Sequence, residues 1–294
     1  MTLFPPSRRA FCAGAAGLGL SALAGPALAA VQLPEALAYE HATGGRVGVY
    51  ARDLRSGRVL AWRADERFVM CSSFKASLAA CVLRRVDRGQ ERLERIIRYG
   101  AEDFVGHAPV ARANLAKGGL SVEAMCRAAV EVSDNTCANK LLASIGGPMA
   151  LTAFWRAIGD EVTRLDHNEP ELNRSRPGDP HDTTTPKAMA DNLRRFILDD
   201  VLESASRQRL TGWMIACQTG ADRLRGGLPA AWRIGDKTGN NGSDAAGDIA
   251  VAWPAPGRPI LIATYVQGGS PTSQQITDLF AAVGRRVGRE FAAG

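Results

Sequence analysis

Residues 71–88 read C-S-S-F-K-A-S-L-A-A-C-V-L-R-R-V-D-R, and here the chain changes from strand-like to helical patterns. The spacing of apolar residues predicts a helix over Phe74–Arg88. Ser72 and Lys75 are three positions apart, which places them on one helical face within a turn. A lysine amine whose pKa is lowered can take the proton of a serine nucleophile. Alone, however, Ser-x-x-Lys is more often a capping serine followed by an exposed lysine.

Working outward from this helix, strand patterns lie towards both ends of the chain and helical patterns lie between them. A short helix near 33–42 precedes a β-hairpin of 46–50 and 58–62, which turns at Ser56-Gly57. Further helices are predicted at 122–132, 137–145, 148–158, 186–198 and 205–214. Strands are predicted at 232–235, 249–253 and 260–266, before an amphipathic helix at 272–291.

This order predicts an α+β fold, in which an antiparallel β-sheet is built from both chain termini and flanked by helices. We expect residues 30–66 and 215–294 to form an α/β lobe, and residues 67–214 to form an inserted all-helical lobe. Within the second lobe, residues 164–185 are rich in Pro, Asp and Asn and have no clear period. A loop of this length without regular structure tends to be functional.

Residues 1–29 have the pattern of an export signal. Ser7-Arg8-Arg9-Ala10-Phe11 is a twin-arginine motif, a weakly apolar stretch follows it, and Ala27-Leu28-Ala29 is a small-x-small cleavage site. We therefore expect export to the periplasm or medium and no membrane attachment after cleavage. Cleavage removes Arg8 and Arg9 and lowers the formal charge from +6 to +4. This mild basicity lacks Lys/Arg runs interleaved with aromatic residues, so we expect no nucleic-acid partner.

The cysteines and histidines do not form a metal-binding pattern. Five cysteines remain after cleavage, an odd number that leaves at least one free thiol or an intermolecular bridge: Cys71, Cys81, Cys126, Cys137 and Cys217. There is no C-x-x-C motif, and the four histidines do not fall at ligand spacing. We expect neither a metal nor another cofactor.

Two further short motifs carry suitable chemistry. Ser133-Asp134-Asn135 separates two helical patterns, and alone it is more often a polar turn with a capping residue. Lys237-Thr238-Gly239 follows the apolar run 232–235, where Lys and Thr could bind a carboxylate while Gly lets a substrate approach the backbone. Taken singly, this motif is more often a strand that ends in a turn.

The three motifs together, in this order, resemble those of the class A β-lactamases and, more distantly, of the penicillin-binding proteins. The resemblance covers nearly the whole mature chain and includes Arg164-Leu165-Asp166, Glu169-Pro170-Glu171-Leu172-Asn173, Asp182-Thr183-Thr184-Thr185-Pro186 and Trp213-Met214. It implies hydrolysis of anionic β-lactams through an acyl-enzyme on Ser72. It also implies that residues 164–185 form the family's Ω-shaped active-site loop.

The resemblance assigns a role to each site residue. Catalytic roles fall to Ser72, Lys75, Ser133, Glu169 and Asn173. Substrate binding falls to Asn135, Lys237, Thr238, Gly239, Asn240, Arg223 and His107. Either Lys75, or Glu169 through a water, would remove the proton of Ser72, and this choice stays open. Ser133 would pass a proton to the departing nitrogen, and the N–H groups of Ser72 and Asn240 would form the oxyanion hole.

Glu169 distinguishes the two related families, because the matching glutamate and asparagine of β-lactamases hold the water that hydrolyses the acyl-enzyme. Arg223 would supply the guanidinium that other members carry at the position of Ala246. His107 stands where an aromatic residue usually lines the entrance, and its charge would vary near neutral pH.

Other departures concern the loop and the cysteines. His167 replaces an arginine that often pairs with the loop aspartate, here Asp182, so we expect a weaker pair at high pH and a looser loop. Cys71 precedes the nucleophile as in several carbapenem-hydrolysing members, but no cysteine follows Gly239 to pair with it. Cys126 matches half of another family disulfide whose partner position is Ala79, so we expect no such bridge.

Two alternatives are a penicillin-binding DD-peptidase-like enzyme and a non-catalytic β-lactam sensor. The first would form a stable acyl-enzyme with benzylpenicillin. The second normally adjoins a transmembrane relay, and the sequence has no second apolar segment of about 20 residues. For the β-lactamase we expect a monomer.

Overall fold

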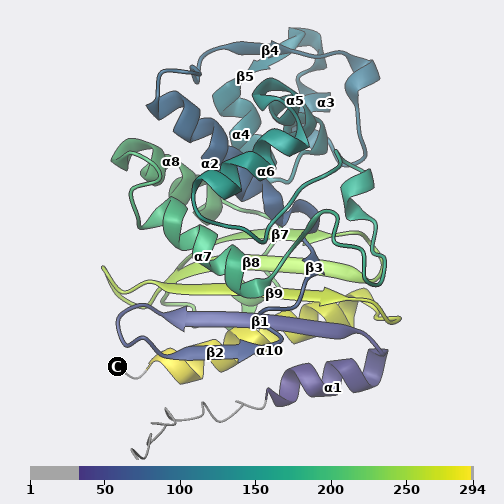
Figure 1. The fold of residues 1–294 in the computed structure, drawn as a ribbon, viewed down its shortest axis with the longest axis vertical. Coiled ribbons are helices and arrows are strands. Elements are labelled where there is room, and N and C mark those ends of the chain that lie inside the picture. Colours follow the sequence, from purple (N-terminus) through teal and green to yellow (C-terminus); the bar gives the residue numbers. More distant parts are fainter. Residues whose placement is uncertain (1–32, 293–294) are drawn as a thin grey trace, which may run out of the picture. The chain divides into compact units, whose positions relative to one another are not determined.

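The computed structural model describes residues 33–292, and the predicted export signal at 1–29 lies outside them. A five-stranded antiparallel sheet in the order β2-β1-β9-β8-β7 organises this part of the chain (Figure 1). Its strands are β1 (Arg46–Asp53), β2 (Val59–Trp62), β7 (Arg233–Asn240), β8 (Ala245–Trp253) and β9 (Ile260–Gln267). Strands from both ends of the chain thus lie side by side, which confirms the predicted α+β architecture.

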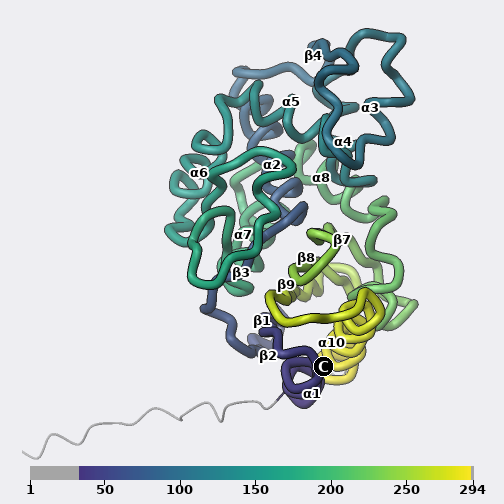
Figure 2. The backbone as a smooth tube through the Cα atoms, turned by 90° about the vertical axis from the view of Figure 1, so that its right-hand side faces the viewer, coloured from purple at the N-terminus to yellow at the C-terminus, as the bar shows by residue number. Residues whose placement is uncertain are grey.

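Side chains of the central strands alternate between two apolar cores. On β1, Val47 and Val49 join the core beneath α1 (Pro34–Thr43) and α10 (Ser273–Ala292), whereas Tyr50 joins the core on the other face. This two-residue alternation is what a pleated strand buried on both faces requires. Figure 2 shows the strands with α10 on one side and α7 (Pro186–Ile197) on the other.

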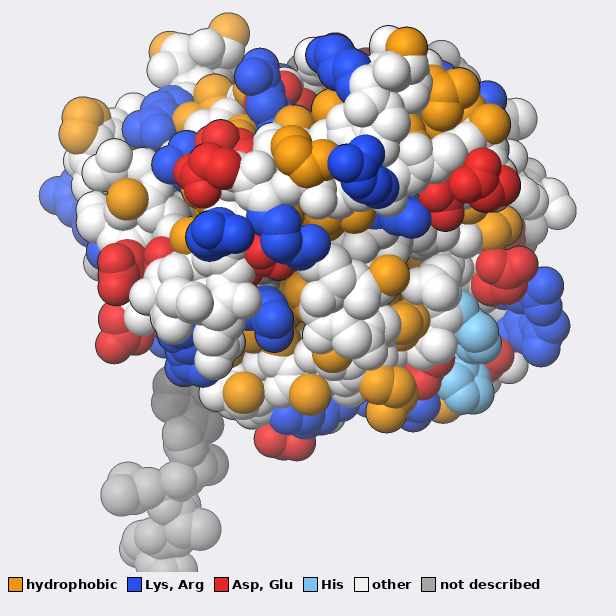
Figure 3. Space-filling view, turned by 90° about the horizontal axis from the view of Figure 1, so that it is seen from above, with side chains coloured by type: hydrophobic (Ala, Val, Ile, Leu, Met, Phe, Trp, Pro, Cys, Tyr) orange, Lys and Arg blue, Asp and Glu red, His pale blue; other side chains and the backbone are white. Residues whose placement is uncertain are grey.

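The helical layer is packed around α2 (Phe74–Asp87), whose residues are buried without a break from Phe74 to Leu83. The other long helices of this layer are α4 (Val122–Glu131), α5 (Asn135–Ile145), α6 (Pro148–Ala157) and α8 (Ser204–Ile215). Short elements complete it: α3 (Pro109–Ala113), β3 (Phe68–Val69), β4 (Ile96–Arg98), β5 (Gly119–Ser121) and β6 (Thr183–Thr184). Helix α9 (Leu224–Gly227) instead packs against α10 on the other side of the sheet. Figure 3 shows that Lys and Arg side chains intersperse with Asp and Glu over the face seen from above.

Local signals explain where the helices begin. The side chains of Ser121, Asp134 and Thr185 each accept a hydrogen bond from the backbone N–H three residues on, and so cap α4, α5 and α7. The Asp134 cap starts α5 two residues earlier than the expected residue 137, so Asn135 lies in its first turn. No helix within 33–292 is long and apolar enough to cross a bilayer.

Strand β7 departs from the sequence-based expectation. The apolar run predicts a strand that ends at Gly235, but β7 continues to Asn240 and therefore contains Lys237-Thr238-Gly239. Pairing with β8 carries it onward, with Thr238 opposite Asp248 and Gly239 opposite Gly247. A ladder of backbone hydrogen bonds does not require apolar side chains, so hydrophobic periodicity misses this extension.

Candidate active site

A cavity of about 350 Å³ opens between the N-terminal end of α2, the loop before α5, strand β7 and the loop 164–185. Nine of its ten lining residues are among the predicted site residues: Ser72, His107, Ser133, Asn135, Glu169, Asn173, Thr238, Gly239 and Asn240. The tenth is Thr219. Lys75 and Lys237 lie buried behind the wall, and Arg223 lines a neighbouring cavity instead.

Ser72 lies in a single 3-10 turn, Cys71–Ser73, immediately before α2. Cys71 has a φ of 45°, a left-handed conformation that costs energy for a residue other than glycine. Ser72 Oγ lies 3.1 Å from Glu169 Oε1, and within residues 33–292 it makes no direct hydrogen bond to Lys75. The turn therefore presents the hydroxyl to a carboxylate that comes from a distant part of the chain.

Lys75 is fully buried and donates to acceptors on two segments, residues 133–135 and the loop that carries Glu169. Its Nζ lies 2.9 Å from Ser133 O, 2.5 Å from Asn135 Oδ1 and 3.1 Å from Glu169 Oε1. Burial lowers the pKa of Lys75, and the charge of Glu169 opposes that shift. This ammonium joins residues 133–135 to Glu169, and it becomes a base if it loses its proton.

Ser133 lies between two ammonium groups. Its backbone has a φ of 61°, and its Oγ accepts hydrogen bonds from Lys75 Nζ at 3.3 Å and Lys237 Nζ at 3.2 Å. Lys237 also donates to Thr238 O at 2.7 Å. Desolvation by burial lowers the pKa of Lys237 to about 8, with Lys75 contributing in the same direction. The Ser133 hydroxyl is thus placed to exchange protons with either amine.

Glu169 is fixed through its side chain and its backbone. Asn173 Nδ2 donates to Glu169 Oε2 at 2.5 Å. Asn139 on α5 donates to Glu169 O at 2.9 Å and accepts from Glu169 N at 3.0 Å. The sequence analysis missed Asn139, although it follows Asn135 by four positions and so shares its helical face. These contacts leave Oε1 directed at Ser72 and Lys75.

Strand β7 forms the opposite wall and approaches the nucleophile closely. A Cβ on Gly239 would lie 2.7 Å from Ser72 N and 2.8 Å from Met70 O, so only glycine fits here. Thr238 Oγ1 lies 2.5 Å from the hydroxyl of Thr219, which was also missed. Nothing in the sequence around Thr219 signals this contact, because it joins segments 19 residues apart.

Arg223 and His107 occupy the margins of the site. Arg223 Nη1 donates to the carbonyl oxygens of Gly239 at 3.0 Å and Gly247 at 3.1 Å. Its guanidinium therefore connects β7 and β8 by hydrogen bonds from outside the main cavity. His107 lines the cavity, and its Nε2 lies 2.9 Å from Val132 O.

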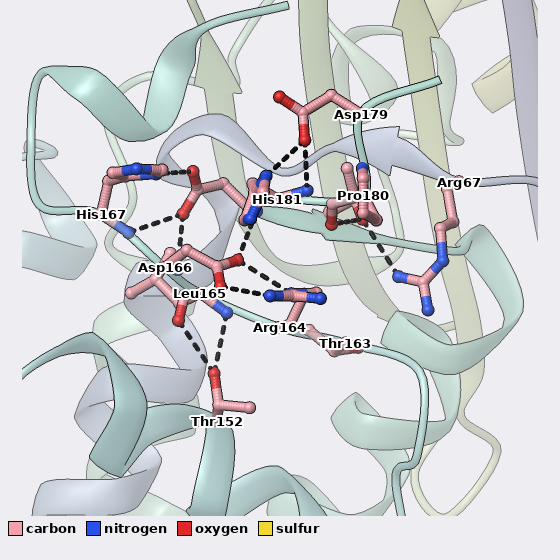
Figure 4. A network of polar contacts seen from close by, with 12 residues as sticks. Arg67, Thr152, Thr163, Arg164, Leu165, Asp166, His167, Asp179, Pro180 and His181 are labelled. Atoms are coloured by element: carbon pink, nitrogen blue, oxygen red, sulfur yellow. Dashed lines mark hydrogen bonds and ion pairs between the residues drawn. The ribbon is translucent and has the colours of Figure 1, made fainter. Parts of the chain in front are cut away.

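The loop carrying Glu169 is closed by a polar network at its base (Figure 4). His167 Nδ1 lies 2.7 Å from Asp182 Oδ2, so the contact expected between these residues is present. Asp182 Oδ1 also accepts from the backbone N–H groups of Asp166 and His167. Arg164 pairs with Asp166 at 2.6 Å. The network therefore joins residues 164–167, which precede Glu169, to Asp182 near the end of the loop.

The five cysteines at positions 71, 81, 126, 137 and 217 are all free and buried. Burial raises the pKa of each thiol, to about 12 for Cys81. Within the described residues, no group of three or more His, Cys, Asp or Glu side chains is arranged to hold a metal ion.

Comparisons with known proteins agree on one family. A family model described as "Beta-lactamase enzyme family" matches residues 31–291. The chain is 48% identical over 253 residues to Beta-lactamase L2 of Stenotrophomonas maltophilia, a match that covers 86% of this chain and 83% of that protein. It is 43% identical to Beta-lactamase FAR-1 of Nocardia farcinica, covering 86% of this chain and 80% of that one. It is also similar to a solved ancestral (GNCA) class A β-lactamase, with a TM-score of 0.84, 54% identity and coverage of 88% and 100%.

Proposed function

This chain belongs to the class A β-lactamase family and hydrolyses β-lactams, and we propose that it does so through an acyl-enzyme on Ser72. In the proposed acylation, Ser72 Oγ attacks the lactam carbonyl carbon and the C–N bond of the ring breaks. Glu169, directly or through a water, takes the hydroxyl proton, while Lys75 remains the alternative base. The 3.1 Å contact between Ser72 and Glu169 favours the carboxylate.

Ser133 is the proposed donor to the departing ring nitrogen. Its hydroxyl is hydrogen-bonded by two ammonium groups, so a proton given to the nitrogen can be replaced from Lys75 or Lys237. The N–H groups of Ser72 and Asn240 are the proposed oxyanion hole. The close approach of Gly239 to Ser72 N supports this, because it brings the backbone of β7 beside that N–H.

Deacylation would use the same carboxylate. Glu169, oriented by Asn173, would activate a water that attacks the ester carbonyl and releases Ser72. The observation that carries the proposal is the position of Glu169 Oε1, at 3.1 Å from both Ser72 Oγ and Lys75 Nζ. A carboxylate at that point can serve both half-reactions.

Substrate binding would rest mainly on the opposite wall. Lys237 supplies positive charge, and Thr238 a hydroxyl, for the substrate carboxylate. Asn135 would contact the amide of the substrate side chain, and His107 would line the entrance. Arg223 holds these carbonyl oxygens through Nη1 alone and lines a neighbouring cavity together with Asn240, so we propose that its guanidinium adds to the positive potential near Asn240.

Two assays test these roles. Nitrocefin turnover measures hydrolysis, and intact-protein mass spectrometry after incubation with benzylpenicillin detects the acyl-enzyme. We expect wild type to turn over, Ser72→Ala to form no adduct, and Glu169→Ala to accumulate an adduct with the mass of intact benzylpenicillin. A stable adduct on wild type without turnover would instead indicate a penicillin-binding enzyme. An adduct on Ser72→Ala would refute the assignment of the nucleophile.

We further propose that residues 1–29 direct export of a monomeric enzyme through the twin-arginine route, and that residues 67–214 act as a helical lobe between the two parts of the α/β lobe. The Ser7-Arg8-Arg9 motif supports the export proposal. Replacing Arg8 and Arg9 by lysine should retain β-lactamase activity in the cytoplasm. Unchanged periplasmic activity would contradict this route.

A further inference from the structure

A further cavity, of about 280 Å³, lies between the C-terminal half of α2 and helix α6. It is separate from the catalytic cavity, with which it shares no lining residue. Lys75 and Arg84 are nine positions apart on α2, so the groove lies about 14 Å along the helix axis from Lys75. We call it the α2–α6 groove.

The floor of the groove is apolar. Ala150, Ala153, Phe154 and Ala157 line it from α6, at the spacing that places residues on one face of a helix. Ala153 and Ala157 are exposed, and the adjoining Met149 is 67% exposed. The groove therefore offers an apolar helix face to solvent, although such faces are normally covered.

The rim of the groove is cationic. Arg84 and Arg85 in the last turn of α2 and Arg88 immediately after it line the groove, and no acidic residue is among the lining residues. Within residues 33–292, none of these three guanidinium groups forms an ion pair. Of the nearby acids, Asp87 accepts from Ser206 and from a backbone N–H. Glu91 forms its ion pair with Arg95, although the charge of Arg85 also helps to lower the pKa of Glu91.

Three observations favour an anion with an apolar part as the ligand of this cluster. Arg85 Nε is buried from solvent and has no hydrogen-bond partner, which is costly for a charged donor. The guanidinium of Arg84 lies 5.8 Å from the ring centre of Phe154 and thus joins the cationic rim to the apolar floor. Desolvation lowers the pKa of Arg84, and the charge of Arg88 adds to this effect. An incoming anion would offset that repulsion.

We propose that the α2–α6 groove binds an amphipathic carboxylate, such as a medium-chain fatty acid. The carboxylate would accept hydrogen bonds from the arginines of the rim, which suit its planar geometry. The alkyl chain would lie on the alanines and Phe154 of α6. This site takes a ligand of a different class from the substrate, and its occupation does not depend on Ser72 chemistry.

Isothermal titration of the mature enzyme with dodecanoate, below its micelle concentration, tests the proposal. We expect saturable binding of one molecule, strengthened up to about fourfold for each methylene from octanoate to dodecanoate. Dodecyltrimethylammonium and dodecyl maltoside carry the same chain without the anion, so neither should bind this site. Equal binding of all three would overturn the proposal, because it would show unspecific detergent behaviour.

Substitutions in the α2–α6 groove test whether dodecanoate binds there. Arg84→Gln combined with Arg88→Gln should weaken dodecanoate binding at least about tenfold. Ala153→Asp, which places a carboxylate on the exposed floor, should do the same by repulsion. The matched control is Arg112→Gln, because Arg112 also lies over a ring, 4.5 Å from the centre of Phe104, but far along the chain. Unchanged affinity in both groove variants, or an equal loss in the control, would refute the assignment.

Competition separates this site from the catalytic one. Dodecanoate at saturation should leave the KM for nitrocefin within about twofold of its value without ligand. A purely competitive pattern, with KM rising in proportion to dodecanoate, would place the ligand in the catalytic cavity and overturn the proposal. Circular dichroism of each variant would show whether a lost affinity reflects unfolding.

Discussion

The charge on Lys237 should set the upper pH limit of catalysis. Its side chain extends from β7 and is fully buried, and its pKa of about 8 lies more than two units below that of an exposed lysine. If the protonated form binds the substrate carboxylate, about half of the enzyme is competent at pH 8 and about a tenth at pH 9. We therefore expect kcat/KM for benzylpenicillin to fall about fivefold between pH 8 and pH 9.

The depth of that fall can also be worked out. A hydrogen bond between a charged donor and a carboxylate contributes about 1.5–3 kcal/mol, so a neutral Lys237 should reduce kcat/KM by about 10- to 150-fold and no further. The loss should appear mainly in KM, because the carboxylate is bound in the ground state as well as in the transition state. Initial rates between pH 6 and pH 10.5 measure both quantities.

Two comparisons isolate Lys237 from Lys75, which is also buried. Benzylpenicillin methyl ester has no carboxylate, so its weaker hydrolysis should lack this alkaline limb. Lys237→Arg keeps its charge throughout this range, so its limb should move beyond pH 10. If the ester and the arginine variant both retained the limb near pH 8, the titrating group would not be Lys237.

Three further predictions follow from the loop, the β7 contact and the thiols. His167→Arg should keep the pair with Asp182 charged at all working pH values. It should therefore raise the melting temperature by about 1–3 °C and slow the turnover of bulky cephalosporins. If neither the melting temperature nor this turnover changed, the pair would not restrain the loop. Gly239→Ala should force β7 away from Ser72, with a loss of about 1–3 kcal/mol in the free energy of unfolding and at least about tenfold in kcat, whereas wild-type values would refute the close approach. Titration of the denatured, unreduced mature protein should give five thiols, and a count of three or one would reveal disulfides.

The sequence predicts best those elements whose signals are local. Helix α2 ends within one residue of its expected limit, because its apolar spacing and its flanking polar residues lie within one segment. The prediction for β7 stops at Gly235 because the polar residues 236–240 are kept in the strand by pairing with β8 and not by a local signal. The two- and three-residue strands are missed because so few residues cannot display a period.

The residues of the candidate site likewise differ in whether local sequence signals reveal them. Short motifs identify residues whose chemistry is evident from their spacing, such as Ser72 with Lys75. Asn139 and Thr219 act through contacts with Glu169 and Thr238 that only the folded chain creates. The position of Arg223 outside the main cavity likewise depends on carbonyl groups of two strands, which a linear pattern does not reveal.

The pairing of β1 with β9 has a consequence for biosynthesis. Val47 on β1 lies opposite Val266 on β9. During synthesis, β1 therefore cannot pair with β9 until more than 200 further residues have been made. At usual elongation rates this takes about 10 to 40 s. Throughout that interval β1 has an unpaired edge towards β9, and its Val47 and Val49 lack the core they later join. The nascent chain therefore depends on protection from aggregation until its last strand emerges, and truncation before residue 260 should give insoluble protein rather than a smaller folded enzyme.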